Sequence, residues 1–234
     1  MTAGEDSIGI LSLVATPIGN LSDLSPRACE ILGRSDLIAC EDTRVTKKLL
    51  DHLSFSKTLV SYREENEVKK TTELADLLEQ GKSIALVSDA GYPGISDPGF
   101  RLVRECRIRG IPIVPVPGPN AAITVLAASG LPTHQFLFLG FLPKKSAGAR
   151  RALKEWKEFG GSLILYESKY RIEKTLGLIE EELGSERTVC LAREVTKLHE
   201  SFLVGTVSET IKRNRTSSSK GEFTLIIGPD GYVL

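Results

Sequence analysis

Residues that bind metals or form disulfides are scarce in this chain. It has three histidines, none of them in a His-Glu-x-x-His pattern, and four cysteines without a Cys-x-x-Cys pair. The cysteines lie among aliphatic neighbours, which is typical of small buried side chains rather than of disulfides or zinc ligands. We therefore expect no metal site.

Net charge and long apolar runs are also lacking. Thirty basic residues balance thirty acidic ones, whereas proteins that coat nucleic acid non-specifically are usually basic. No segment has the unbroken apolar length of a membrane-spanning helix. The acidic residues 1–6 do not resemble a secretion signal. We expect a cytoplasmic protein with no membrane partner, which binds RNA only through local basic patches.

The common phosphate-binding and hydrolase motifs are missing as well. Gly81-Lys82-Ser83 resembles the end of a P-loop, but Asp76 stands where that motif requires its first glycine. There is no Gly-x-Gly-x-x-Gly and no Gly-x-Ser-x-Gly sequence. These absences disfavour an NTPase, a dinucleotide-dependent oxidoreductase and a serine hydrolase.

A regular alternation of strand and helix patterns fills the first part of the chain. Short β-branched runs predict strands at 8–15, 36–40, 58–62, 83–87 and 111–116. Helical patterns separate these runs, and a small-residue helix over 121–128 follows them. The alternation is typical of a parallel sheet covered by helices.

The pattern changes after Leu131-Pro132. An apolar run at 136–141 precedes a basic loop, and further strands are predicted at 163–166, 188–192, 201–204 and 223–227. Thr206 and Glu209 have the spacing of a capping box at the start of the last helix. We therefore predict two α/β domains, residues 1–132 and 133–234.

Three loops rich in glycine and proline follow strands of the first domain, at 16–20, 88–99 and 117–122. Loops at the carboxyl ends of parallel strands line the ligand crevice of an open sheet. Glycine lets the backbone approach a ligand closely, and proline fixes that backbone in advance. One such loop is most simply a turn required by folding, but three together predict a cofactor cleft.

Sequence motifs in these loops and beyond follow one another along nearly the whole chain. They are 16–21 (TPIGNL), 41–44 (EDTR), 88–99, 117–119 (PGP), 129–132 (SGLP), 141–145 (FLPKK), 166–168 (YES), 192–197 and 220–223 (KGEF). In these motifs the chain resembles the ribosomal RNA small-subunit 2'-O-methyltransferases, within the tetrapyrrole methylase superfamily. It departs from their usual pattern at Asn120, where serine is usual, and at Lys169-Tyr170, where Pro-His is usual.

The resemblance implies an α/β fold of the tetrapyrrole methylase type, with S-adenosylmethionine in a cleft between the two domains. It further implies a homodimer that 2'-O-methylates a decoding-centre cytidine of 16S ribosomal RNA within the small ribosomal subunit. The cofactor residues it implies are Pro17, Asp89, Ala90, Gly91, Ile95, Ser96, Asn120, Ala121, Ala122, Ala192, Phe223 and Thr224. Backbone groups on small residues suit the methionine end, while Phe223 and Ile95 offer apolar surface to the adenine.

A ribose hydroxyl attacks a methyl group poorly while it is protonated, so a positioned base helps. Glu41 and Asp42 follow the second strand, and Glu167 follows a strand of the second domain; these are our candidates for the base. An alternative for Glu41 and Asp42 is a structural role at a helix N-terminus, with Arg44 as ion-pair partner.

Basic side chains are needed for the RNA backbone. Lys144, Lys145, Arg150 and Arg151 cluster beside the apolar run at 136–141, and Arg44 follows the second strand. We predict that these five contact phosphate, although charge runs often only face solvent.

Two alternatives stay open at this point. One is a methyltransferase of corrin or porphyrin precursors on the same fold, although those relatives usually begin with a Gly-x-Gly-Pro-Gly loop where this chain has Thr16–Asn20. The other is a non-catalytic assembly factor that binds ribosomal RNA.

Overall fold

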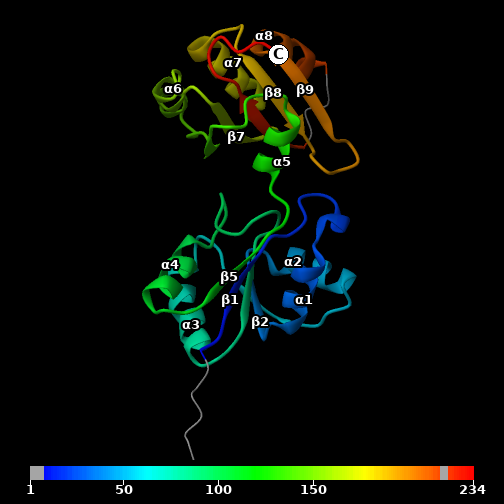
Figure 1. Ribbon diagram of the computed structural model, residues 1–234, viewed down its shortest axis with the longest axis vertical. Helices are drawn as coiled ribbons and strands as arrows, with labels where there is room; N and C mark the ends of the chain where they lie inside the picture. Colours follow the sequence, from blue (N-terminus) through cyan, green and yellow to red (C-terminus); the bar gives the residue numbers. More distant parts are fainter. Residues whose placement is uncertain (1–7, 217–220) are drawn as a thin grey trace, which may run out of the picture. The chain divides into compact units, whose positions relative to one another are not determined.

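A computed structural model describes residues 8–216 and 221–234, which form two compact units. The first unit ends at Asn120 and the second runs from Ala121 to Leu234. Each contains one five-stranded sheet with helices (Figure 1), so the predicted α/β fold with two such units is confirmed. Lys220, the first residue of the motif at 220–223, lies outside the described residues.

The first unit is a parallel sheet between two helical layers. Its strands are β1 (Leu11–Val14), β2 (Leu37–Cys40), β3 (Thr58–Ser61), β4 (Ile84–Val87) and β5 (Ile113–Val116), in the order β3-β2-β4-β1-β5. Its helices are η1 (Leu21–Asp23), α1 (Pro26–Arg34), α2 (Thr43–His52), α3 (Glu67–Glu79) and α4 (Phe100–Ile108). Helices α1 and α2 cover one face and α3 and α4 the other, as Figure 1 shows. All pairings are parallel, so the carboxyl ends of the strands lie along one edge.

Local sequence explains where these elements begin. The Ser25 side chain accepts a hydrogen bond from the Ala28 amide (3.1 Å), and Pro26 occupies the first helical position of α1. Such a cap satisfies an amide that otherwise has no partner in the helix. Strands β2 and β4 are buried along their whole length, as expected for strands covered on both faces.

The second unit has a mixed sheet. Its strands are β6 (Phe136–Phe141), β7 (Ser162–Ser168), β8 (Thr188–Arg193), β9 (Ser201–Thr206) and β10 (Glu222–Ile227), in the order β6-β7-β10-β8-β9. Only β6 and β7 pair in parallel. Helices α6 (Ser146–Glu155), α7 (Ile172–Leu183) and α8 (Val207–Arg215) bury one face of the sheet. The predicted capping box is confirmed, because Thr206 and Glu209 exchange side-chain-to-backbone hydrogen bonds at the start of α8.

Helix α5 (Ala121–Ala128) belongs to the second unit. It packs on β10 and β7, and the Ala122 amide donates a hydrogen bond to the Tyr166 hydroxyl (3.2 Å). The division between the units therefore falls before α5, whereas the change of pattern in the sequence predicts a domain boundary at Pro132.

A bulge interrupts the pairing of β6 with β7. Phe138 lies opposite Ile164 and Phe141 opposite Tyr166, so β6 uses one residue more than β7 over this stretch. The extra residue places both phenylalanines beside Tyr166, with ring centroids 5.0 Å and 5.9 Å from its ring. Bulges of this kind re-aim side chains that strict alternation would send to the opposite face.

No helix within residues 8–216 and 221–234 combines the length and the apolar character that crossing a membrane requires.

Candidate functional site

The three glycine- and proline-rich loops of the first unit meet at the carboxyl edge of its sheet. Thr16, after β1, and Gly91, after β4, exchange two backbone hydrogen bonds of 2.9 and 3.1 Å. The Ser88 hydroxyl donates to the Gly91 carbonyl (3.1 Å), and the Thr16 hydroxyl donates to the Ser88 carbonyl (3.0 Å). These bonds fix the loops after β1 and β4 against each other.

The third loop joins them at Gly91. A Cβ atom on this glycine would lie 3.5 Å from the Ile18 side chain and 3.8 Å from the Pro119 carbonyl oxygen. Gly91 also has a φ of +84°, a conformation that favours glycine. The loops after β1, β4 and β5 therefore pack together around Gly91, which is itself buried. Exposed residues of these loops, such as Gly19, Ala90 and Ser96, are the part that a ligand such as S-adenosylmethionine would reach.

The remaining predicted cofactor residues of the first unit lie in the same loops. Pro17 is partly buried, Ala90 is exposed, and the Ile95 side chain is 43% exposed. Ser96 is exposed and has a φ of +64°. Asn120 ends the loop after β5 and is partly buried. The structure brings the three loops together. That each of these residues contacts a cofactor stays a prediction.

Carboxylates gather at this edge. One Asp89 oxygen accepts a hydrogen bond from the Asp42 amide (2.9 Å), which ties the loop after β4 to the loop after β2. Burial, together with the charges of Asp89, Glu65 and Asp42, raises the pKa of Glu41. Burial and the nearby Glu41 charge raise the pKa of Asp97 to about 7. Partly buried carboxylates that repel one another hold protons more tightly than free ones.

The Asp42 side chain has a structural role at the start of α2. Its side chain accepts a hydrogen bond from the Arg44 amide (2.8 Å) as the N-cap of α2. It also binds the Arg44 guanidinium, with distances of 2.5 to 3.2 Å. Hydrogen bonds from the Arg44 side chain and amide hold the pKa of Asp42 well below its usual value. A carboxylate that holds a proton this weakly is a poor base, and the geometry favours the structural alternative for Asp42 and Arg44.

Glu167 is also engaged. Its side chain is 1% exposed and accepts hydrogen bonds from the Thr175 hydroxyl and the Ser168 amide, both at 2.7 Å. The Arg171 guanidinium lies 3.5 Å away. These partners occupy both carboxylate oxygens and leave almost no surface for a substrate, so the geometry favours a structural role for Glu167.

Four predicted cofactor residues of the second unit gather around α5. Ala192 and Thr224 are opposite one another in the pairing of β8 with β10, and Thr224 is opposite Tyr166 in the pairing with β7. The Tyr166 hydroxyl accepts from the amide of Ala122, in the first turn of α5, and Ala121 starts that helix. The register thus places Ala121, Ala122, Ala192 and Thr224 at one place on the sheet.

Phe223 faces the other way. Its side chain is 3% exposed and belongs to the core beneath α6, α7 and α8. Neighbouring residues of a strand point to opposite faces, so Phe223 and Thr224 cannot present side chains to one ligand. The expected stacking of the Phe223 ring on adenine does not fit this geometry. Only the backbone of Phe223, and not its ring, could contact a ligand that lies on the Thr224 face of the sheet.

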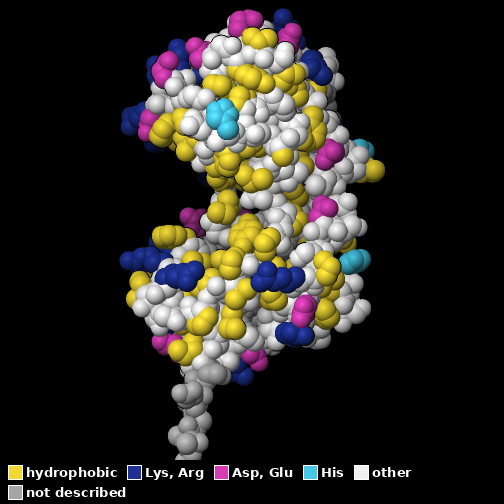
Figure 2. Space-filling model, viewed as in Figure 1, with side chains coloured by type: hydrophobic (Ala, Val, Ile, Leu, Met, Phe, Trp, Pro, Cys, Tyr) yellow, Lys and Arg dark blue, Asp and Glu magenta, His cyan; other side chains and the backbone are white. Residues whose placement is uncertain are grey.

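The five predicted RNA-binding residues differ in how their charges are compensated. Arg44 binds Asp42, and Arg150 binds Glu181 and Glu182 across α6 and α7. Figure 2 shows basic and acidic side chains interleaved over the edge of the second unit where α6 lies. Within the described residues, Lys144, Lys145 and Arg151 are exposed and form no ion pair. Phosphate binding by these three residues stays a prediction, and their free charges suit it better than those of Arg44 and Arg150.

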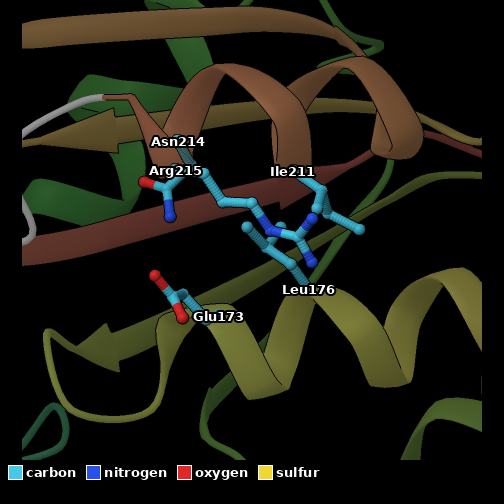
Figure 3. A pocket seen from close by; sticks show the side chains of 5 residues that line it. All are labelled: Glu173, Leu176, Ile211, Asn214 and Arg215. Atoms are coloured by element: carbon cyan, nitrogen blue, oxygen red, sulfur yellow. The ribbon is translucent and has the colours of Figure 1, made fainter.

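A small hollow lies elsewhere on the second unit. Glu173 and Leu176 of α7 line it together with Ile211, Asn214 and Arg215 of α8 (Figure 3). It contains none of the predicted site residues. Among the residues described, no group of three or more His, Cys, Asp or Glu side chains is arranged to hold a metal ion.

Asp97 is the functional candidate that sequence reasoning missed. It lies near the end of the glycine- and proline-rich loop at 88–99, three residues before α4 (Phe100–Ile108) begins. The useful signal was a carboxylate inside a glycine- and proline-rich loop that follows a buried strand. Its proximity to Glu41 depends on the adjacency of β2 and β4, which the sequence does not state.

Comparison with known proteins places these features in a family. Residues 11–211 match the family model described as Tetrapyrrole (Corrin/Porphyrin) Methylases. The chain is 50% identical to "Ribosomal RNA small subunit methyltransferase I" of Halalkalibacterium halodurans, over 97% of this chain and 78% of that protein. It is 47% identical to the protein of the same name from Escherichia coli O157:H7, over 96% of this chain and 79% of that protein.

Solved structures share the fold. The crystal structure of diphthine synthase superposes with a TM-score of 0.71 at 11% identity, covering 94% of this chain and 90% of that one. Identity this low shows a common architecture only.

Proposed function

This chain belongs to the tetrapyrrole methylase family, and we propose that it transfers a methyl group from S-adenosylmethionine to the ribose 2'-hydroxyl of a decoding-centre cytidine in 16S ribosomal RNA. The observation that carries the proposal is the identity of about half of all residues, over nearly the whole chain, with two proteins named as small-subunit ribosomal RNA methyltransferases. We further propose that the protein acts in the cytoplasm, as a homodimer, on the small ribosomal subunit.

The loops of the first unit fit the cofactor chemically. S-adenosylmethionine, when bound, supplies an electrophilic methyl group on a positively charged sulfur, and its methionine end carries an ammonium. Asp89 provides negative charge beside the loops that meet at Gly91, and Glu41 and Asp97 are close enough to Asp89 to interact with its charge. We propose that Asp89 binds the ammonium, because its carboxylate is already oriented by the Asp42 amide.

Asp97 and Glu41 are suited to take up the proton of the ribose hydroxyl. A base works best when its pKa lies near the working pH, and such a base contributes roughly 10²–10⁴-fold to the rate. Asp97, with a pKa raised to about 7 by burial and by Glu41, meets that condition better than a free carboxylate does. Because the two residues repel each other, we propose that they act as a pair in which one proton is shared between the two sites. Orienting the hydroxyl towards the methyl group contributes a further part of the barrier, about 7–11 kcal/mol in favourable cases.

Asp42 and Glu167 are assigned positioning roles in this mechanism. Asp42 orients Asp89 through its backbone amide and caps α2 through its side chain. Glu167 holds the turn between β7 and α7. Their loss is expected to reduce activity through stability and geometry rather than through proton transfer.

The direct test is transfer of a tritiated methyl group to small ribosomal subunits, followed by mapping of alkali-resistant ribose positions. Label at a single ribose of the decoding centre supports the proposal, and label on a base removes the 2'-O assignment. Calorimetry with S-adenosylmethionine, on the wild type and on Asp89→Ala, tests the cofactor site. A wild type that binds no cofactor would point to the non-catalytic assembly factor instead.

A further inference from the structure

Two loops at one edge of the second sheet carry exposed side chains that the proposed reaction leaves unused. One loop, residues 143–145, follows β6, and the other, residues 169–171, follows β7. Strands β6 and β7 run parallel, so both loops leave the sheet at the same edge. We refer to them together as the paired loops.

Arg171 fastens the paired loops to each other. Its Nη2 atom donates to the carbonyl oxygens of Leu142 (2.9 Å) and Pro143 (3.3 Å), immediately before Lys144. Glu167, which is buried beneath the turn, lies 3.5 Å from the same guanidinium and orients it. The side chains carried by the two loops are therefore displayed from a fixed backbone, which lowers the entropy lost when a ligand binds.

The charge on the paired loops is positive and uncompensated. Lys144, Lys145 and Lys169 are exposed, and no carboxylate in the described part of the chain forms an ion pair with them. Arg150, in the helix that follows the first loop, differs from these lysines because it binds Glu181 and Glu182. Three free ammonium groups on a chain with zero formal net charge indicate a polyanionic partner.

Tyr170 adds an aromatic surface beside Lys169, on the same loop. Its side chain is 85% exposed, and the Lys169 ammonium lies 4.9 Å from the ring centroid. An exposed aromatic ring beside a cation is the combination on which unpaired bases stack in sites that bind single-stranded nucleic acid. A protein partner would equally use the tyrosine but has less need of three free lysines.

We propose that Tyr170 is a stacking platform for an unpaired base of the RNA substrate, and that Lys144, Lys145 and Lys169 bind the phosphates on either side of that base. The inference rests on the proposed function, because it assumes an RNA substrate. It adds to that function a recognition element outside the loops that carry the reaction.

The experiment measures binding of the full chain to purified small ribosomal subunits, by anisotropy of the labelled protein over a range of salt concentrations. Tyr170→Ala is expected to weaken binding about 5- to 100-fold, as the loss of one stacked base does. Tyr170→Phe keeps the ring and should bind within about two-fold of the wild type. The slope of log K against log salt concentration is negative. The double variant Lys144→Ala with Lys145→Ala should reduce its magnitude by about 1.4, since each phosphate contact of a single strand contributes about 0.7. Lys154→Ala is the matched control, because this lysine of α6 is already paired with Glu182, and it should leave the slope unchanged.

Cofactor affinity, measured by calorimetry, should stay at the wild-type value in every variant and thereby shows that the fold is intact. If the wild type binds and methylates the subunits and Tyr170→Ala binds them equally well, the stacking role is overturned. The proposed function would still stand. A Tyr170→Ala variant that loses self-association in sedimentation, while keeping RNA affinity, would identify a protein interface instead and also overturns it. A wild type that neither binds nor methylates the subunits would overturn both proposals together.

Discussion

Replacing Asp97 by asparagine should stabilise the protein at high pH and leave its stability unchanged at low pH. Burial, the Glu41 charge and the Asp89 charge all oppose ionisation of Asp97, while a hydrogen bond with Ser88 partly offsets them. The folded pKa of about 7 exceeds the ordinary value of 3.8. The folded state therefore binds this proton more tightly than the unfolded state does, and the resulting stability is complete below pH 3.8 and lost as the pH rises through 7.

The magnitude follows from the size of that interval. Roughly three pH units at about 1.4 kcal/mol each give an upper limit of about 4 kcal/mol. The side chain is only partly buried, so solvent screening reduces the expected effect to about 2–3 kcal/mol. Asparagine has nearly the same shape as the protonated acid and carries no charge at any pH. The Asp97→Asn variant should therefore match the wild type near pH 4 and melt about 5–10 °C higher at pH 8.5.

Thermal denaturation followed by circular dichroism, at several pH values between 4 and 8.5, checks this expectation. Asp23→Asn is the matched control, because it removes the same charge from an exposed position on η1. A stability difference that stays constant with pH, or an Asp97→Asn variant that is less stable at pH 8.5, would refute the reasoning. A constant difference would mean that folding does not shift the pKa of Asp97, and a less stable variant would mean that its neighbours stabilise the carboxylate. In both cases Asp97 would not be a base with a pKa near neutral pH.

Three further predictions concern the backbone and its caps. Thr206→Ala should lower the free energy of unfolding by about 1 kcal/mol in denaturant titrations through loss of the capping box, whereas Ser208→Ala, inside the same helix, should have little effect. Gly91→Ala should weaken cofactor binding in calorimetry, because a left-handed backbone costs alanine about 1–2 kcal/mol, and Gly110→Ala, with similar φ but open space around it, should lose stability without losing cofactor affinity. Asp42→Asn keeps a side chain able to cap α2 and should leave the melting temperature close to that of the wild type, because an exposed ion pair contributes little to stability. A loss of transfer activity above about a hundredfold at unchanged stability would show instead that Asp42 takes part in the chemistry.

Much of the fold was accessible from sequence because its determinants are local. All nine predicted strands and the alternation with helices are present, and the apolar run at 136–141 forms a further strand, since turn residues and β-branched runs act over a few positions. The capping box at Thr206 was readable for the same reason. The sequence did not reveal which unit α5 belongs to, because its short apolar sequence suits either unit. Only the packing of α5 on β10 and β7 assigns it to the second unit.

The site was predictable to the level of loops but not of side chains. Strand β10 is buried on both faces after its first residue, so its sequence shows no alternation that would tell which face Phe223 takes. Glu167 looked available because it follows a run of apolar residues, yet Thr175, one α7 turn inside the helix, binds its carboxylate. Asp97 and Glu41 lie far apart in the chain, and their mutual effect on pKa arises only from neighbouring strands.

The bulge in β6 makes the length of that strand as important as its composition. Deleting Leu139 would restore simple alternation and turn Phe141 from the Tyr166 side of the sheet to the side covered by helices. Tyr166 would then lose one of its two aromatic neighbours, and its hydroxyl would be less firmly presented to the first turn of α5. Insertions and deletions of a single residue in this strand should accordingly be rarer among relatives than substitutions, since a substitution changes one contact whereas a shift in phase displaces every contact beyond it.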